Sequence, residues 1–271
     1  MIQLLHALAL TGYLLAGTLL ALSLARAEQR LTTLATWTTG AGVLLHAAGL
    51  FSYWLLWHEL PLVGLGPSLS VLALLVGLGS LGVATLGRTG PLGLVLVPVV
   101  AALVGVAVVV GVEPSGEPLS FRGPWFVLHV LLALAGPAGL TVAFAAGLMY
   151  LVQFRELKNK HFGAIFRFFP PLDTLDRMGR WALVAGLPAL TLALALGWAW
   201  TERFHRPFAP GNPKIVWGVL TWVLLAAALL ARTGKGRRGY RGAVASVVAF
   251  LVMVAAYVVL RVSGPGVGGF L

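Results

Sequence analysis

The sequence contains no cysteine and few charged residues: Lys, Arg, Asp and Glu together make up 10% of its 271 residues. The absence of cysteine excludes disulfides, thiolate metal sites and cysteine nucleophiles. A soluble protein of this length needs a charged surface around its core, which so few charges cannot supply. Because 59% of the residues are hydrophobic, we expect the lipid bilayer to be the main solvent of this chain.

Apolar runs fill most of the chain, and each is long enough to cross a hydrocarbon core of about 30 Å as a helix. The runs are continuous and lack the alternation of a β-barrel. The sequence therefore predicts an all-α integral membrane protein, a single polytopic domain over 1–271. The first run is too long for the core of a signal peptide and is interpreted as a span. The eight predicted spans are 2–25, 33–57, 67–87, 91–112, 124–153, 181–201, 214–232 and 242–262.

Basic residues are distributed unequally between the two sides of the predicted membrane domain. Of the nineteen Lys and Arg residues, fourteen lie in the first, third, fifth and seventh connections. The positive-inside rule therefore places these connections in the cytoplasm and both termini outside, in a multi-pass protein of the inner (cytoplasmic) membrane. Orientation in a membrane explains the net charge of +11 without a nucleic-acid partner.

Five of the six histidines are candidate cofactor-binding residues. Four lie near the outer face, and one lies near the middle of the second span, where an ionisable side chain is costly and tends to mark a ligand or pathway. The bland alternatives are exposed loop histidines and a neutral imidazole hydrogen-bonded to a neighbouring helix. The candidates are His6, His46, His58, His129 and His205, with His129, His46 and His205 as candidate metal ligands.

The stretch WAWTERFHRPFAPGNPKIVWGVLTW, residues 198–222, gathers four of the nine tryptophans in an outer connection. Such residues are typical of an interfacial aromatic belt, and they also suit a binding platform for a flat anionic ligand. Neutral imidazole is the usual protein ligand of heme iron, and guanidinium groups pair well with propionates. The additional candidate residues are Trp125, Trp198, Trp200, Arg122, Arg203 and Arg206. A zinc protease motif, a P-loop and a nucleotide-binding glycine fingerprint are not found in the sequence.

The fifth connection contains an aromatic pattern typical of a short helix lying in the membrane interface. Its apolar members are Phe162, Ile165, Phe166 and Phe169. Two acidic residues follow, Asp173 and Asp176, and we expect them to cap the next helix or to pair locally with Arg177 and Arg180.

Several segments, in order, resemble the cytochrome c assembly family, the CcsA, CcmC and HemX group of heme-handling membrane proteins. They are LLHAAGLFSYW, WFVLHVLLALAGPAGLTVAFAAGLMYLVQFRELKNK, FPPLDTLDRMGRWALVAGLPALTLALALGWAW and GYRGAVASVVAFLVMVAAYVV. The resemblance covers about residues 40–260. It implies an eight-helix membrane protein with an outward-facing heme b site, in which His129 matches the histidine that precedes the tryptophan-rich outer loop.

The chain departs from the cytochrome c synthase branches of that family in its outer loop. Trp198 and Trp200 match a tryptophan pair, but the Trp-Asp pair and two later histidines of those branches are absent. This pattern favours HemX-like members and a protein that carries or presents heme, without independent catalysis. The expected partners are heme, membrane lipid, and either a cytochrome c maturation protein or a heme-biosynthesis enzyme. The alternatives are a secondary transporter of another small molecule, a partner-dependent enzyme that attaches heme, and a regulatory membrane scaffold.

Overall fold

Helices make up nearly all of the chain that the structure describes. The structure is a computed structural model, and it describes residues 1–87, 89–114, 123–203, 211–233 and 238–263. Within those ranges there is no strand, in agreement with the predicted all-α fold. The helices are α1 (Ile2–Arg26), α2 (Gln29–Trp57), α3 (Leu65–Thr85), α4 (Gly93–Val110), α5 (Pro124–Lys158), α6 (Ala164–Phe168), α7 (Leu172–Arg203), α8 (Pro213–Leu230) and α9 (Arg238–Ser263), with a 3₁₀ turn η1 (Gly90–Leu92) before α4.

Eight helices within the described ranges are long and apolar enough to cross a membrane, which confirms the predicted all-α bundle of about eight transmembrane helices. The largest extensions past the predicted boundaries are in α5, which continues to Lys158, and in α7, which already begins at Leu172. The prediction followed hydropathy, whereas a helix ends where its backbone hydrogen-bond ladder ends. The short helix α6 lies between α5 and α7, where the aromatic pattern predicted a helix.

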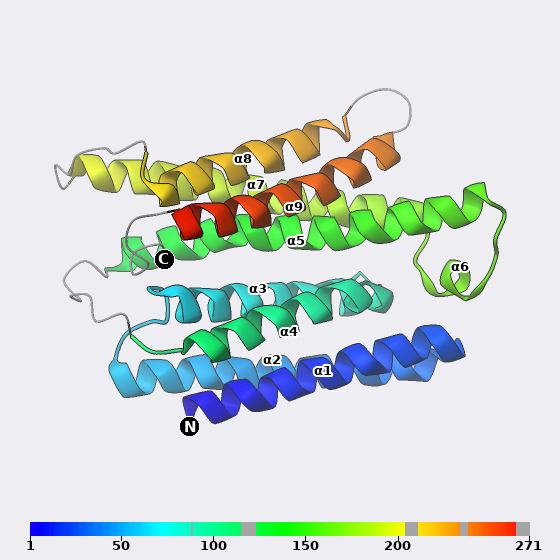
Figure 1. The fold of residues 1–271 in the computed structure, drawn as a ribbon, viewed down its shortest axis with the longest axis horizontal. Coiled ribbons are helices and arrows are strands. Elements are labelled where there is room, and N and C mark those ends of the chain that lie inside the picture. Colours follow the sequence, from blue (N-terminus) through cyan, green and yellow to red (C-terminus); the bar gives the residue numbers. More distant parts are fainter. Residues whose placement is uncertain (88, 115–122, 204–210, 234–237, 264–271) are drawn as a thin grey trace.

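The long helices lie side by side in three layers (Figure 1). α1 and α2 form one layer, α3 and α4 the next, and α5 with α7, α8 and α9 the third. α5 contacts α3 on one side and both α7 and α9 on the other, so it joins the N-terminal half of the bundle to the C-terminal half. The start of α1 and the end of α9 lie at the same end of the bundle, as eight spans require.

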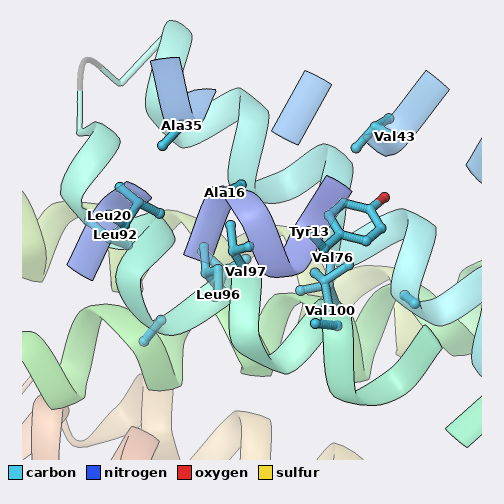
Figure 2. Close-up of a cluster of buried hydrophobic side chains, with 14 of the residues drawn as sticks. Tyr13, Ala16, Leu20, Ala35, Val43, Val76, Leu92, Leu96, Val97 and Val100 are labelled. Atoms are coloured by element: carbon cyan, nitrogen blue, oxygen red, sulfur yellow. The ribbon is translucent and has the colours of Figure 1, made fainter. Parts of the chain in front are cut away.

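The core of the N-terminal half combines small residues with branched and aromatic side chains (Figure 2). Tyr13 and Val100 are fully buried within it. α1 and α2 approach closely because glycine faces the partner helix: a Cβ atom on Gly42 would lie 3.2 Å from the ring of Tyr13. In a bilayer, where hydrophobicity does not draw helices together, such close packing is a main source of helix association.

The C-terminal half is held together by the same kind of contact, now centred on α5. A Cβ atom on Gly139 would lie 2.7 Å from the carbonyl oxygen of Ala182 on α7, and one on Gly147 would lie 2.8 Å from that of Ala243 on α9. α5 therefore presents its glycines to two different neighbours. This packing fixes the rotation of α5 about its axis, and with it the direction in which each α5 side chain points.

A buried arginine joins α8 to α7 and α9, and it corrects one expectation. Asp176 pairs with Arg232, 56 residues further along the chain, rather than with a neighbouring arginine. Arg232 Nη2 also donates to Ser246 Oγ at 3.0 Å. Burial lowers the pKa of Arg232 from its usual value, and the Asp176 carboxylate opposes this effect. Asp176 pairs with Arg232 rather than with an exposed arginine because a buried guanidinium without a carboxylate partner is far more costly than an exposed guanidinium without one.

Candidate functional site

His129 lies in the second turn of α5 and faces α7. Its Nδ1 atom lies 2.8 Å from the carbonyl oxygen of Ala193. Because a carbonyl oxygen only accepts hydrogen bonds, Nδ1 must carry the hydrogen. In the neutral imidazole Nε2 then carries a lone pair, which bonds to no residue in the described ranges. Metal-ligating histidines are typically oriented in this way, with the other ring nitrogen donating to a carbonyl or carboxylate. This hydrogen bond gives His129 the tautomer that binding of a metal through Nε2 would need.

The imidazole of His129 is held in place by the next turn of α7. A Cβ atom on Gly197 would lie 2.9 Å from Cε1 of His129, so only glycine leaves room for the ring in this position. Trp198 follows directly, with 61% of its surface exposed, and Trp125 near the start of α5 is 64% exposed. Two large aromatic surfaces thus remain uncovered on the two helices that position the histidine.

His58 occupies a separate position at the C-terminal end of α2. It is exposed and ends the helix with a left-handed backbone, φ 52°, while its N–H donates to the carbonyl of Trp54. The side chain lines a cavity of about 250 Å³ between the end of α2 and the first turns of α5, where Phe126 and Val127 form the opposite wall. His58 therefore lies beside the start of the helix that carries His129.

His6 and His46 come together inside the N-terminal half, with their ring centroids 5.2 Å apart. Each Nε2 atom lies 2.8 Å from Ser70 Oγ on α3. His6 Nδ1 lies 2.9 Å from the carbonyl oxygen of Ile2, and Tyr13 Oη lies 3.4 Å from His46 Nδ1. All of these polar side chains are fully buried. We call this group the Ser70 network.

One assignment of hydrogens satisfies the whole Ser70 network when both imidazoles are neutral. His6 Nδ1 donates to the Ile2 carbonyl, so His6 Nε2 accepts from the Ser70 hydroxyl. Ser70 Oγ then accepts from His46 Nε2, and His46 Nδ1 accepts from Tyr13 Oη. The lone pairs of both imidazoles are occupied, in contrast to that of His129. This is the hydrogen-bonded arrangement that stood as the alternative to a ligand role for His46.

The remaining predicted site residues lie at or beyond the edge of the described chain. Arg122, His205 and Arg206 are outside the described residues. Arg203 is the last residue of α7. Trp200, one turn before the end of α7, is half-buried.

Sequence reasoning missed Tyr13 and Ser70. A signal for the first was present, because polar and aromatic residues recur every seven positions on α1 and α2. They are His6 and Tyr13 on α1, followed by Thr32, Thr39, His46 and Tyr53 on α2. A spacing of seven keeps residues on one face of packed helices, so this pattern predicts that these side chains lie at the interface of α1 and α2. Ser70 carries no comparable signal.

The comparison with known proteins agrees with this architecture. The sequence model of the cytochrome c assembly protein family matches residues 4–267, nearly the whole chain. The chain belongs to the cytochrome c assembly protein family. The resemblance stated from the sequence is thereby confirmed, and the protein is a multi-pass membrane member of that family.

Similar proteins cover different parts of the chain. The cytochrome c biogenesis protein CcsA of Guillardia theta is 25% identical over 166 residues, 56% of this chain and 55% of that protein. CcsA of Prochlorococcus marinus (strain MIT 9312) is 25% identical over 252 residues, 84% of this chain and 81% of that protein. An uncharacterized 28.8 kDa protein of Azospirillum brasilense is 31% identical over 135 residues, half of each chain. The matched part of the chain thus spans about half the length of the first of these relatives.

Proposed function

We propose that this protein binds heme at the outer ends of α5 and α7 and carries or presents it in cytochrome c maturation. The observation that carries the proposal is the hydrogen bond of 2.8 Å between His129 Nδ1 and the Ala193 carbonyl oxygen. It fixes the tautomer that leaves Nε2 free, and Nε2 of neutral imidazole is a usual ligand of heme iron. Family membership supports the same role, because two of the similar proteins are named for cytochrome c biogenesis.

The surroundings of His129 suit a flat, mostly apolar ligand. Trp125 and Trp198 are exposed on the two helices that hold the histidine, and a porphyrin offers an aromatic face to such side chains. Arg203 at the end of α7 lies one turn beyond Trp200, and with Arg122 and Arg206 it stays the predicted partner of the propionates. The proposed ligand is heme b, bound non-covalently through histidine.

The second axial position has two candidate ligands in this proposal. His58 lies on the α2 side of α5, beside the cavity of about 250 Å³, and has an exposed imidazole. His205 follows α7 by two residues in the tryptophan-rich connection. His6 and His46 are less suited, because binding a metal there would break the Ser70 network.

Titration of the purified full-length protein with hemin in lipid nanodiscs tests this function. We expect a Soret band that saturates at one heme per chain, and weakening of binding by at least about tenfold in His129→Ala, since an axial ligand is lost. His161→Ala is the matched control, because His161 is exposed at the opposite end of α5. Single His58→Ala and His205→Ala variants identify the second ligand by a change in the spectrum. If hemin never binds, or if His129→Ala binds it as the wild type does, the proposal is wrong.

A further inference from the structure

A cavity that combines charged and apolar walls lies at the end of the bundle opposite His129. Its volume is about 520 Å³, within the range of about 300–1,000 Å³ typical of ligand sites. The α1–α2 connection, the α3–α4 connection, α6 and the start of α7 enclose it. These connections belong to the face that holds fourteen of the nineteen Lys and Arg residues of the sequence, so we call this cavity the basic-face cavity.

Some polar side chains that line the basic-face cavity are already hydrogen-bonded within the protein, and others are not. Ser23 and Thr32 are buried, and their hydroxyls already bond to one another at 2.6 Å. Arg167 on α6 and Arg177 on α7 are exposed to the cavity, and neither guanidinium has a hydrogen bond or ion pair with any residue in the described ranges. The positively charged donors available to a ligand therefore belong to two arginines from different elements.

Apolar side chains line the cavity near the two arginines. Phe168, Pro170 and Pro171 line the cavity next to Arg167. Phe162, just before α6, is 61% exposed and packs edge-on against Phe166, with ring centroids 5.1 Å apart. Exposed aromatic residues at the ends of transmembrane helices lie at the level of the lipid head groups. The cavity thus opens where a polar head and the beginning of an acyl chain meet.

We propose that the basic-face cavity binds the phosphodiester head group of an anionic membrane phospholipid. Guanidinium groups bind phosphate oxygens as bidentate donors, and basic pockets between transmembrane helices on the cytoplasmic side hold acidic lipid head groups. Arg167 and Arg177 contact the phosphate, and the Phe168 side of the cavity takes the glycerol backbone. Glu28 lines the same cavity and repels additional negative charge, which favours a singly charged diester such as phosphatidylglycerol over a multiply charged head group.

The consequence for the fold is a lipid that connects the two halves of the bundle. α6 has only five residues and no buried side chain, and its helix contacts are with α1 and α5. Few interactions within the protein therefore hold it in place. A phosphate bound by Arg167 and Arg177 ties α6, which contacts α1, to the start of α7. The site is separate from the one on α5 and α7 that faces outward, so its test is independent of heme binding.

Native mass spectrometry of the delipidated full-length protein tests the site, with phosphatidylglycerol and phosphatidylcholine added in parallel. We expect one phosphatidylglycerol per chain to bind at least about tenfold more tightly than phosphatidylcholine, and Arg167→Gln/Arg177→Gln to abolish that preference. The matched control is Arg155→Gln/Arg180→Gln, which removes the same charge from exposed positions that do not line the cavity. The control should bind phosphatidylglycerol within about twofold of the wild type.

Two results would overturn the lipid site. Equal loss in the cavity variant and the control variant would show that only the overall charge of the basic face attracts the lipid. Displacement of the lipid by millimolar inorganic phosphate would show a small-anion site, because a free phosphate lacks the glycerol and acyl groups that the apolar wall is proposed to hold. Circular dichroism of both variants, expected to match the wild type, separates loss of binding from loss of folding.

Discussion

Replacement of Ser70 by alanine removes a single hydroxyl on which two buried histidines depend. Ser70 Oγ lies 2.8 Å from Nε2 of His6 and 2.8 Å from Nε2 of His46. The change leaves one ring nitrogen without its donor and the other without its acceptor. Neither can turn to another partner without breaking the bond that its second nitrogen makes, to the Ile2 carbonyl or to Tyr13. We therefore expect Ser70→Ala to destabilise the N-terminal half of the bundle.

The size of the effect follows from the value of hydrogen bonds between transmembrane helices. Each bond contributes about 0.6 kcal/mol on average and up to about 1.7 kcal/mol. This is less than the cost of leaving a polar group unpaired in lipid, because the same groups also find partners in the unfolded chain. Two lost bonds therefore lower the free energy of unfolding by about 1–3 kcal/mol. The upper part of this range applies here, because Ser70 and both imidazoles are fully buried.

Equilibrium unfolding in mixed micelles measures this free energy, with Ser80→Ala as the matched control. Ser80 is also buried on α3, but its hydroxyl faces a small cavity and bonds to no residue in the described ranges. We expect the control to lie within about 0.5 kcal/mol of the wild type. Equal stabilities of the two alanine variants would refute the Ser70 network. Hemin binding should be unchanged in Ser70→Ala, since the proposed iron ligand lies on α5.

Three further changes test the packing around the proposed site and the halves of the bundle. Gly197→Ala places a methyl group 2.9 Å from Cε1 of His129. The methyl group rotates the imidazole away from its position without removing it, so hemin binding should weaken by about tenfold in a titration. Gly49→Ala places a methyl group 2.9 Å from the histidine ring on α1 and should lower the free energy of unfolding by about 1–3 kcal/mol. Asp176→Asn leaves the buried Arg232 without its carboxylate and should cost about 3 kcal/mol on the same measurement, the lower end for a buried pair because 32% of the Asp176 side chain is exposed.

Each of these changes has a control at a comparable position. Gly40→Ala adds the same methyl group on α2 where no other atom lies within 4 Å, so it should be neutral or slightly stabilising. Asp173→Asn removes an exposed carboxylate from the first turn of α7 and should change stability by less than about 0.5 kcal/mol. A glycine variant that behaves like Gly40→Ala, or an Asp176 variant that behaves like Asp173→Asn, would contradict the packing described for that site.

The membrane fold could be predicted from the sequence because hydropathy alone determines it. Each span needs about twenty apolar residues, and the eight runs met that condition without any knowledge of neighbours. The boundaries of α5 and α7 were less accessible, since Lys158 and Leu172 lie in polar extensions that hydropathy does not register. The partner of Asp176 was predicted wrongly for a related reason: nearby arginines are visible in the sequence, whereas Arg232 approaches only after α7 and α8 pack.

For the candidate site, the sequence predicts only how deep each histidine lies in the membrane. The position of His129 in its span gives its depth but not the direction in which it points, which depends on how the glycines of α5 pack against α7 and α9. The contact with Ala193 therefore needed the structure. Depth alone separated His6, near the outer face, from His46, near the middle of the second span, although their spacing from Tyr13 and Thr39 by seven residues indicated a shared interface between α1 and α2.

Chemical rescue of His129→Gly with imidazole tests the central claim most directly. Glycine leaves a space where the imidazole ring stood, and free imidazole can occupy that space and supply the nitrogen that the account assigns to iron. We predict that His129→Gly loses the Soret spectrum of the wild-type complex and that millimolar imidazole restores it, while the spectrum of a His161→Gly control needs no imidazole. An unchanged spectrum in His129→Gly without imidazole would show that His129 does not bind the iron.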